Sequence, residues 1–209
     1  MTDEFWSNQP VIPVVVINDA KRAVDLAHTL VASGTKKIEI TLRTPAALEA
    51  ISRISAEVPD ALVGAGTVVD LQTATRAVEA GAKFLVSPGS TKNLIDALSG
   101  SRLPFLSGCS TLSEALELLE NGVSTAKFFP AVESGGIAWL KAVSTVIPQL
   151  SFCPTGGIGL ANYKDFLALP NVACVGGSWI APAKLIDEGN WEEIKKLASN
   201  VNMEKNRLE

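Results

Sequence analysis

A lysine in the middle of a short apolar stretch is the residue of this chain best placed for chemistry. Lys127 lies between Ala126 and Phe128 in residues 125–130, with Phe129 two positions further on. In a buried strand the side chains alternate between two faces, so Lys127 and Phe129 share one face. Burial disfavours the charged form of an ammonium group, and the neutral amine is the form that attacks a carbonyl carbon to give a Schiff base. The alternative interpretation is that Lys127 marks a strand end and extends into water, as most lysines do.

Three polar side chains alternate with apolar ones in a second strand-like stretch. Glu39, Thr41 and Arg43 share one face of residues 38–43, and the other face is aliphatic. If the polar face is turned inward, a carboxylate and a guanidinium are costly to bury unless they are paired or take part in a reaction. We therefore predict that this face belongs to a functional site. The alternative is a buried structural ion pair between Glu39 and Arg43.

Pairs of glycines follow two later apolar stretches. Gly156 and Gly157 come directly after Thr155, and Gly176 and Gly177 come directly before Ser178. Without a β-carbon, such residues let backbone N–H groups approach an anion closely. One such pair is usually a turn, but two pairs with neighbouring hydroxyl side chains predict a phosphate site. The substrate is then a small phosphorylated molecule.

The elements that carry these residues repeat along the whole chain. Strands are expected over residues 11–17, 37–42, 62–67, 84–88, 104–109, 125–130, 151–154 and 172–176. Helices are expected over residues 18–34, 45–58, 72–81, 92–99, 110–122, 136–146 and 161–169 and at the C-terminus. Apolar strands joined by helices indicate a parallel sheet, and eight such units predict an α/β protein with one (β/α)8 TIM-barrel domain over residues 1–209.

An open doubly wound sheet is the alternative architecture, because the repeat does not itself show closure. The sequence Gly64-Ala65-Gly66 follows a strand, but the GxGxxG pattern of that fold is not completed. In a barrel, the active site lies at the C-terminal ends of the strands, where the polar residues above are placed.

The composition argues against several classes of partner. The chain has 209 residues, 47% of them hydrophobic, with a formal net charge of −4. Nucleic acid would find no basic surface, no apolar stretch reaches membrane-spanning length, and no residues have metal-site spacing. Cys109, Cys153 and Cys174 lie far apart in apolar segments, which is typical of reduced core cysteines in a cytoplasmic protein. We expect a cytoplasmic protein that binds a small molecule and uses no metal or other cofactor.

Six segments together carry a resemblance to a known family. They are residues 39–44 (EITLRT), 63–68 (VGAGTV), 87–89 (SPG), 127–131 (KFFPA), 153–158 (CPTGGI) and 176–179 (GGSW). In this order they resemble the 2-keto-3-deoxy-6-phosphogluconate (KDPG) aldolases, class I lyases of the Entner–Doudoroff pathway. One departure is Ser107-Gly108, where the family more often has Pro-Gly.

The resemblance implies a role for each candidate residue. Lys127 would be the Schiff-base lysine and Glu39 the general acid/base. The implied substrate-binding residues are Arg43 and Thr67 at the pyruvyl carboxylate, Pro88 and Phe129 at the pocket wall, Thr155 at the hydroxyls, and Gly156, Gly157, Gly177 and Ser178 at the phosphate. The implied reaction is cleavage of KDPG to pyruvate and glyceraldehyde 3-phosphate by a homotrimer. Activity on 4-hydroxy-2-oxoglutarate (KHG) is also a property of the family.

Other functions use similar parts. An aldolase of the same fold could act on KHG alone or on the C4-epimeric galactonate substrate. An enzyme dependent on pyridoxal phosphate would also have a buried lysine and a phosphate site, but no partner for the pyridine nitrogen is found here. A sugar-phosphate binder without catalytic activity is the alternative from another class.

Overall fold

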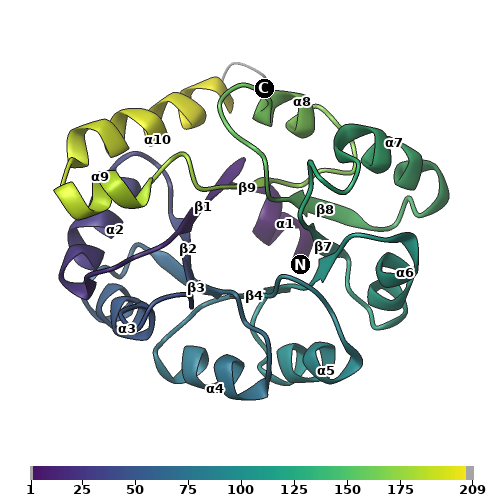
Figure 1. Ribbon diagram of the computed structural model, residues 1–209, viewed down its shortest axis with the longest axis horizontal. Coiled ribbons are helices and arrows are strands. Elements are labelled where there is room, and N and C mark those ends of the chain that lie inside the picture. Colours follow the sequence, from purple (N-terminus) through teal and green to yellow (C-terminus); the bar gives the residue numbers. More distant parts are fainter. Residues whose placement is uncertain (1, 206–209) are drawn as a thin grey trace.

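The computed structural model describes residues 2–205, and its strands pair in parallel throughout that range (Figure 1). The strands are β1 (Val11–Val15), β2 (Lys37–Thr41), β3 (Leu62–Gly66), β4 (Leu85–Val86), β5 (Phe105–Leu106), β6 (Gly108–Cys109), β7 (Thr125–Phe128), β8 (Ser151–Pro154) and β9 (Val175–Gly177). Seven of the eight ranges expected to be strands each contain or overlap one observed strand. The predicted α/β class with a parallel sheet is confirmed.

The expected strand over residues 104–109 is divided in two because its pairing partner changes. β5 pairs with β4, whereas β6 pairs with β7. Ser107 separates them, and its carbonyl oxygen accepts a hydrogen bond of 2.9 Å from the backbone N–H of Lys127. The last strand also begins later than expected, because Val172 makes only an isolated bridge with Phe152.

The strands form two parallel sheets that share a curved arrangement. One has six strands in the order β5-β4-β3-β2-β1-β9, and the other has three in the order β6-β7-β8. Isolated bridges from Phe152 to Val172 and from Thr155 to Gly176 lie between the β8 and β9 regions. Figure 1 shows the strands around a central region, with most helices outside them.

The helices after α1 follow the expected units with shifts at their ends, and the expected helical C-terminus contains two helices, α9 and α10. They are α1 (Thr2–Ser7), η1 (Ala20–Arg22), α2 (Ala23–Ala32), α3 (Ala47–Glu57), α4 (Leu71–Glu79), α5 (Lys92–Gly100), α6 (Leu112–Glu120), α7 (Gly136–Val146), α8 (Tyr163–Leu167), α9 (Ala183–Glu188) and α10 (Trp191–Lys205). α6 begins with a reciprocal capping box between Thr111 and Glu114. Within residues 2–205, no helix combines the length and the apolar character needed to cross a bilayer.

The short helix α1 was not predicted from the sequence, and its tryptophan joins a separate core. Trp6 is fully buried and packs edge-on against Phe84, with ring centroids 5.6 Å apart. The same cluster contains strand or strand-adjacent residues Ile12, Val86, Leu106, Cys153 and Cys174. In Figure 1, α1 lies in the central region that the strands surround. The larger core lies between the strands and the outer helices.

Candidate active site

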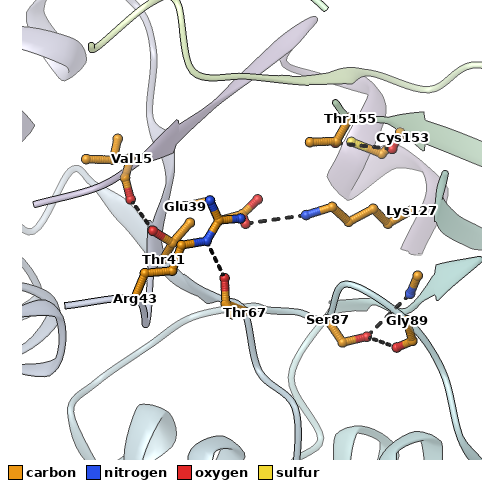
Figure 2. A network of polar contacts seen from close by, with 11 residues as sticks. Val15, Glu39, Thr41, Arg43, Thr67, Ser87, Gly89, Lys127, Cys153 and Thr155 are labelled. Atoms are coloured by element: carbon orange, nitrogen blue, oxygen red, sulfur yellow. Dashed lines mark hydrogen bonds and ion pairs between the residues drawn. The ribbon is translucent and has the colours of Figure 1, made fainter. Parts of the chain in front are cut away.

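Lys127 is buried and faces a carboxylate from a distant strand. It lies on β7 with 4% of its surface exposed, and its Nζ is 3.6 Å from Oε1 of Glu39 on β2. The same Nζ lies 5.3 Å from the centre of the Phe129 ring. Figure 2 shows the Lys127 and Glu39 side chains pointing toward each other. The interpretation of Lys127 as a solvated strand end is therefore wrong.

Glu39 is paired with the lysine and is not bonded to Arg43 in the described part of the chain. It is 3% exposed, and no hydrogen-bond partner of its Oε1 is found among residues 2–205. The buried Glu39–Arg43 pair that the sequence left open is therefore not formed there. A carboxylate that is near an amine, and has few fixed hydrogen bonds, is placed to exchange protons with groups bound between them.

Arg43 and Thr67 meet at the rim of this site. Arg43 follows β2, Thr67 follows β3, and the arginine Nε donates a hydrogen bond of 3.2 Å to the threonine Oγ1 (Figure 2). Thr67 has a φ of 61°, in the left-handed region that β-branched residues rarely adopt. Such strain occurs often at functional sites. The exposed guanidinium can bind a carboxylate through two parallel hydrogen bonds.

The two glycine pairs are brought together by the sheet. Thr155 bridges Gly176, so the segment after β8 runs beside the end of β9. Gly156 and Gly157 have φ values of 99° and 70°, a conformation that glycine adopts without strain. Ser178 is exposed directly after β9. The segments that carry these residues therefore lie side by side at the C-terminal ends of β8 and β9.

The predicted wall residue Pro88 lies against the strand next to Lys127. A β-carbon added to Gly108 would be 2.2 Å from the carbonyl oxygen of Pro88, and Gly108 is the residue that pairs with Lys127 in the sheet. Ser87 and Ser107 are fully buried nearby, with their hydroxyl oxygens 3.3 Å apart. Sequence reasoning missed this hydroxyl pair, because each serine alone resembles an ordinary strand-end residue.

The described residues offer no cluster of three or more metal-binding side chains. Cys109 is buried near the site, and burial together with the charge of Glu114 raises the pKa of its thiol to about 12. A neutral thiol of this kind is a poor nucleophile. The arrangement therefore leaves a buried amine and a carboxylate, with anion-binding groups at two edges.

Comparisons with known proteins agree with this arrangement. A family model described as KDPG and KHG aldolase matches residues 2–197. The chain is 45% identical over 200 residues to the 2-dehydro-3-deoxy-phosphogluconate aldolase of Pseudoalteromonas atlantica, covering 96% of this chain and 93% of that protein. It is 46% identical over 196 residues to the KHG/KDPG aldolase of Escherichia coli, covering 94% and 92% of the two chains.

A solved structure is similar over nearly the whole chain. It is the KDPG aldolase of Legionella pneumophila, with a TM-score of 0.93, 46% identity, and coverage of 96% of this chain and 98% of the other. That crystal structure contains pyruvate captured at low pH as a covalent carbinolamine intermediate.

Proposed function

This chain belongs to the KDPG and KHG aldolase family, and we propose that it is a class I aldolase that cleaves KDPG to pyruvate and glyceraldehyde 3-phosphate. The observation that carries the proposal is the 3.6 Å approach of Lys127 Nζ to Glu39 Oε1 between two buried side chains. This pair supplies a nucleophilic amine and a proton carrier at one point. The reaction is a lyase step of the Entner–Doudoroff pathway and of carbohydrate metabolism.

Lys127 is the nucleophile in this mechanism. Its neutral amine attacks the C2 ketone of KDPG, giving a carbinolamine that loses water to form a protonated imine. The carbinolamine trapped in the Legionella pneumophila enzyme supports such a first step. The positive imine then accepts the electron pair of the C3–C4 bond.

Glu39 transfers the protons. Cleavage of the C3–C4 bond requires loss of the C4 hydroxyl proton, which the carboxylate accepts directly or through water while glyceraldehyde 3-phosphate leaves. The remaining enamine takes a proton at C3 to become the imine of pyruvate. Water then hydrolyses this imine, releasing pyruvate and restoring the amine of Lys127.

The ends of the substrate are held by the two anion-binding edges. Arg43 and Thr67 bind the pyruvyl carboxylate through charge-assisted and hydroxyl hydrogen bonds. Pro88 and Phe129 form the wall beside Lys127, and Thr155 contacts the substrate hydroxyls. The phosphate lies against the segments of Gly156, Gly157, Gly177 and Ser178, with the bridge from Thr155 to Gly176 holding these segments side by side. No cofactor takes part in these steps.

KHG is a second substrate of the same site. It has the same 2-keto acid part but releases glyoxylate, which carries no phosphate. The family description, which names both substrates, supports this activity. We expect Ser178→Asp to lower kcat/KM for KDPG more than for KHG, because the added charge repels a doubly charged phosphate. An equal loss with both substrates would remove Ser178 from the phosphate site.

We further propose that the described residues, 2–205, form one closed eight-stranded barrel, while residue 1 and residues 206–209 of the domain expected over 1–209 lie outside the described range. The supporting observations are the chain-order sequence of neighbouring strands, the pairing of β9 with β1, the isolated bridges from the β8 segment to the β9 segment, and the division of one strand between two partners. A doubly wound sheet would instead reverse its strand order near the middle.

The assembly and the compartment are also proposals. The family resemblance suggests a homotrimer, and exposed apolar side chains such as Leu71 and Val146 offer surface for contacts between subunits. Sedimentation at several concentrations tests this, and a monomer throughout would contradict it. Three buried free cysteines fit the reducing cytoplasm.

The function is tested by product release. Purified protein is mixed with KDPG, and pyruvate formation is followed by a coupled dehydrogenase assay, with the C4 epimer and KHG as comparison substrates. Lys127→Met should abolish release, and Lys141→Met, which changes an exposed lysine on α7, should not. A folded wild-type protein that binds KDPG without cleaving it would favour a non-catalytic sugar-phosphate binder.

A further inference from the structure

The space where residue 66 would carry a side chain is filled by the carboxylate of Glu39. A β-carbon built on Gly66 would lie 2.0 Å from Oε1 of Glu39 and 2.7 Å from both its Cδ and its Cγ. These are the three nearest atoms to that position. The sequence places Gly66 at a strand end and in the segment 63–68 that carries the family resemblance, but it does not show which side chain lies across it.

The backbone at Gly66 does not itself need a glycine. Its φ lies outside the left-handed region, unlike that of the following Thr67. The residue pairs in register with Thr41 of β2, and its carbonyl oxygen accepts a hydrogen bond of 2.8 Å from the backbone N–H of Leu42. The strand is therefore fixed in place, and the requirement for glycine at this position is steric.

Little else fixes the position of the Glu39 carboxylate. Oε1, the oxygen closest to Gly66, is also the atom 3.6 Å from Lys127 Nζ, and it has no hydrogen-bond partner among the described residues. An ion pair at this distance constrains direction less than a hydrogen bond does. The contact surface of Gly66 is thus the main limit on how far the carboxylate can move toward β3.

We propose that Gly66 is a positioning residue that sets the place of Glu39 relative to Lys127. The proposal rests on the proposed function, in which Glu39 transfers protons. Ordinary van der Waals contact begins at 3.4 Å, so a methyl group at position 66 displaces Oε1 by more than ~1 Å. Displacements of this size cost catalytic groups about 100-fold in rate. The end of the glutamate side chain moves while the strands stay, so the fold is retained.

The experiment measures exchange of the pyruvate methyl hydrogens with deuterium from the solvent, followed by proton NMR. The reaction needs imine formation at Lys127 and proton transfer at C3, but no aldehyde. We expect Gly66→Ala to slow exchange by about 100-fold and to change its pD profile, because the proton-transferring carboxylate is displaced. Gly100→Ala is the matched control, since a β-carbon there meets nothing within 4 Å. Exchange by Gly66→Ala at the wild-type rate and with the wild-type pD profile would overturn the proposal.

A double-mutant cycle of thermal stability, with substitutions at positions 66 and 39, tests the inference if Gly66→Ala folds poorly. Glu39→Ala removes all three atoms that the new methyl group would meet. The loss of thermal stability caused by Gly66→Ala should therefore disappear in the Glu39→Ala background. A loss of the same size in both backgrounds would overturn the proposal. Absence of exchange in the wild-type protein would instead overturn the proposed function, and the inference with it.

Discussion

Two pairs of buried side chains in the region that the strands surround have opposite character. Toward the N-terminal ends, Trp6 and Phe84 form an apolar cluster with ring centroids 5.6 Å apart. Toward the C-terminal ends, Glu39 and Lys127 form a buried ion pair with few other contacts. Trp6 lies on α1 and Phe84 directly before β4, whereas Glu39 and Lys127 lie on β2 and β7. Burial of apolar rings stabilises the fold directly, whereas a buried ion pair costs desolvation that its attraction need not recover.

This difference indicates a division of labour along the strands. The side chains at the apolar end contribute to the stability of the fold, whereas the polar end holds groups that are useful only in a reaction. Substitutions at the two ends should therefore move stability and activity in different ways. The following variants test that separation.

The largest effect is expected from removing the ion pair as a unit. Lys127→Met combined with Glu39→Met should abolish aldol cleavage and leave the protein as stable as the wild type or up to about 4 kcal/mol more stable. Lys127→Met alone should lose about 3–5 kcal/mol, because Glu39 then remains buried without a partner. Urea unfolding of the three proteins measures this. A double variant much less stable than the wild type would show that the polar end also supports the fold.

The apolar end should show the reverse pattern. Trp6→Ala should cost about 3–5 kcal/mol of unfolding free energy, because a fully buried ring is replaced by a cavity. At a temperature where the variant is folded, we expect cleavage activity within about twofold of the wild type, since rates change little when reacting groups keep their places. Lys141→Ala, at an exposed site on α7, serves as the control. A large fall in activity of folded Trp6→Ala would contradict the separation.

Substitution of the strained residue Thr67 at the polar end should have two smaller effects, a gain in stability and a loss of substrate affinity. Thr67 has a φ of 61°, which asparagine tolerates better than threonine. Thr67→Asn should therefore raise stability by about 1 kcal/mol. It should also raise KM for the pyruvyl substrate by about tenfold, because a hydroxyl that accepts from Arg43 is lost. Urea unfolding and steady-state kinetics of the same variant measure both effects. An unchanged KM would place Thr67 outside the substrate site.

The last effect appears only at alkaline pH and is absent at neutral pH, where the other variants are compared. Burial raises the pKa of Cys109 from 9.0 to about 12, so the folded state keeps the thiol proton after the unfolded state has lost it. The stabilisation is present below pH 9 and is lost as the pH rises toward 12. Cys109→Ala should therefore lose less stability than the wild type between these values. Parallel curves for the two proteins would show that this thiol titrates normally.

Much of this arrangement could be predicted from residue patterns. The alternation of polar and apolar residues over 38–43 predicted that Glu39 faces inward, and the glycine pairs predicted the loops after β8 and β9. Local sequence patterns determine these features, so no tertiary information was needed. The helices between the strands were found for the same reason, with a capping box at Thr111 marking the start of α6.

Features that depend on contacts between distant segments could not be predicted. The partner of Glu39 could have been Arg43, and only the curvature of the sheets places Lys127 beside it. The short helix α1 lacks a helical repeat long enough to recognise, and Trp6 is buried because of its contact with Phe84. The steric role of Gly66 likewise depends on a side chain from another strand.

Borohydride reduction in the presence of pyruvate shows whether the buried amine of Lys127 forms a Schiff base. The protein is incubated with pyruvate, reduced, digested, and the modified peptide is identified by mass spectrometry, with Lys127→Met as the control. We expect one adduct, on Lys127, and none in the variant. A folded wild-type protein that binds pyruvate but gives no adduct, or an adduct on another lysine, would contradict it.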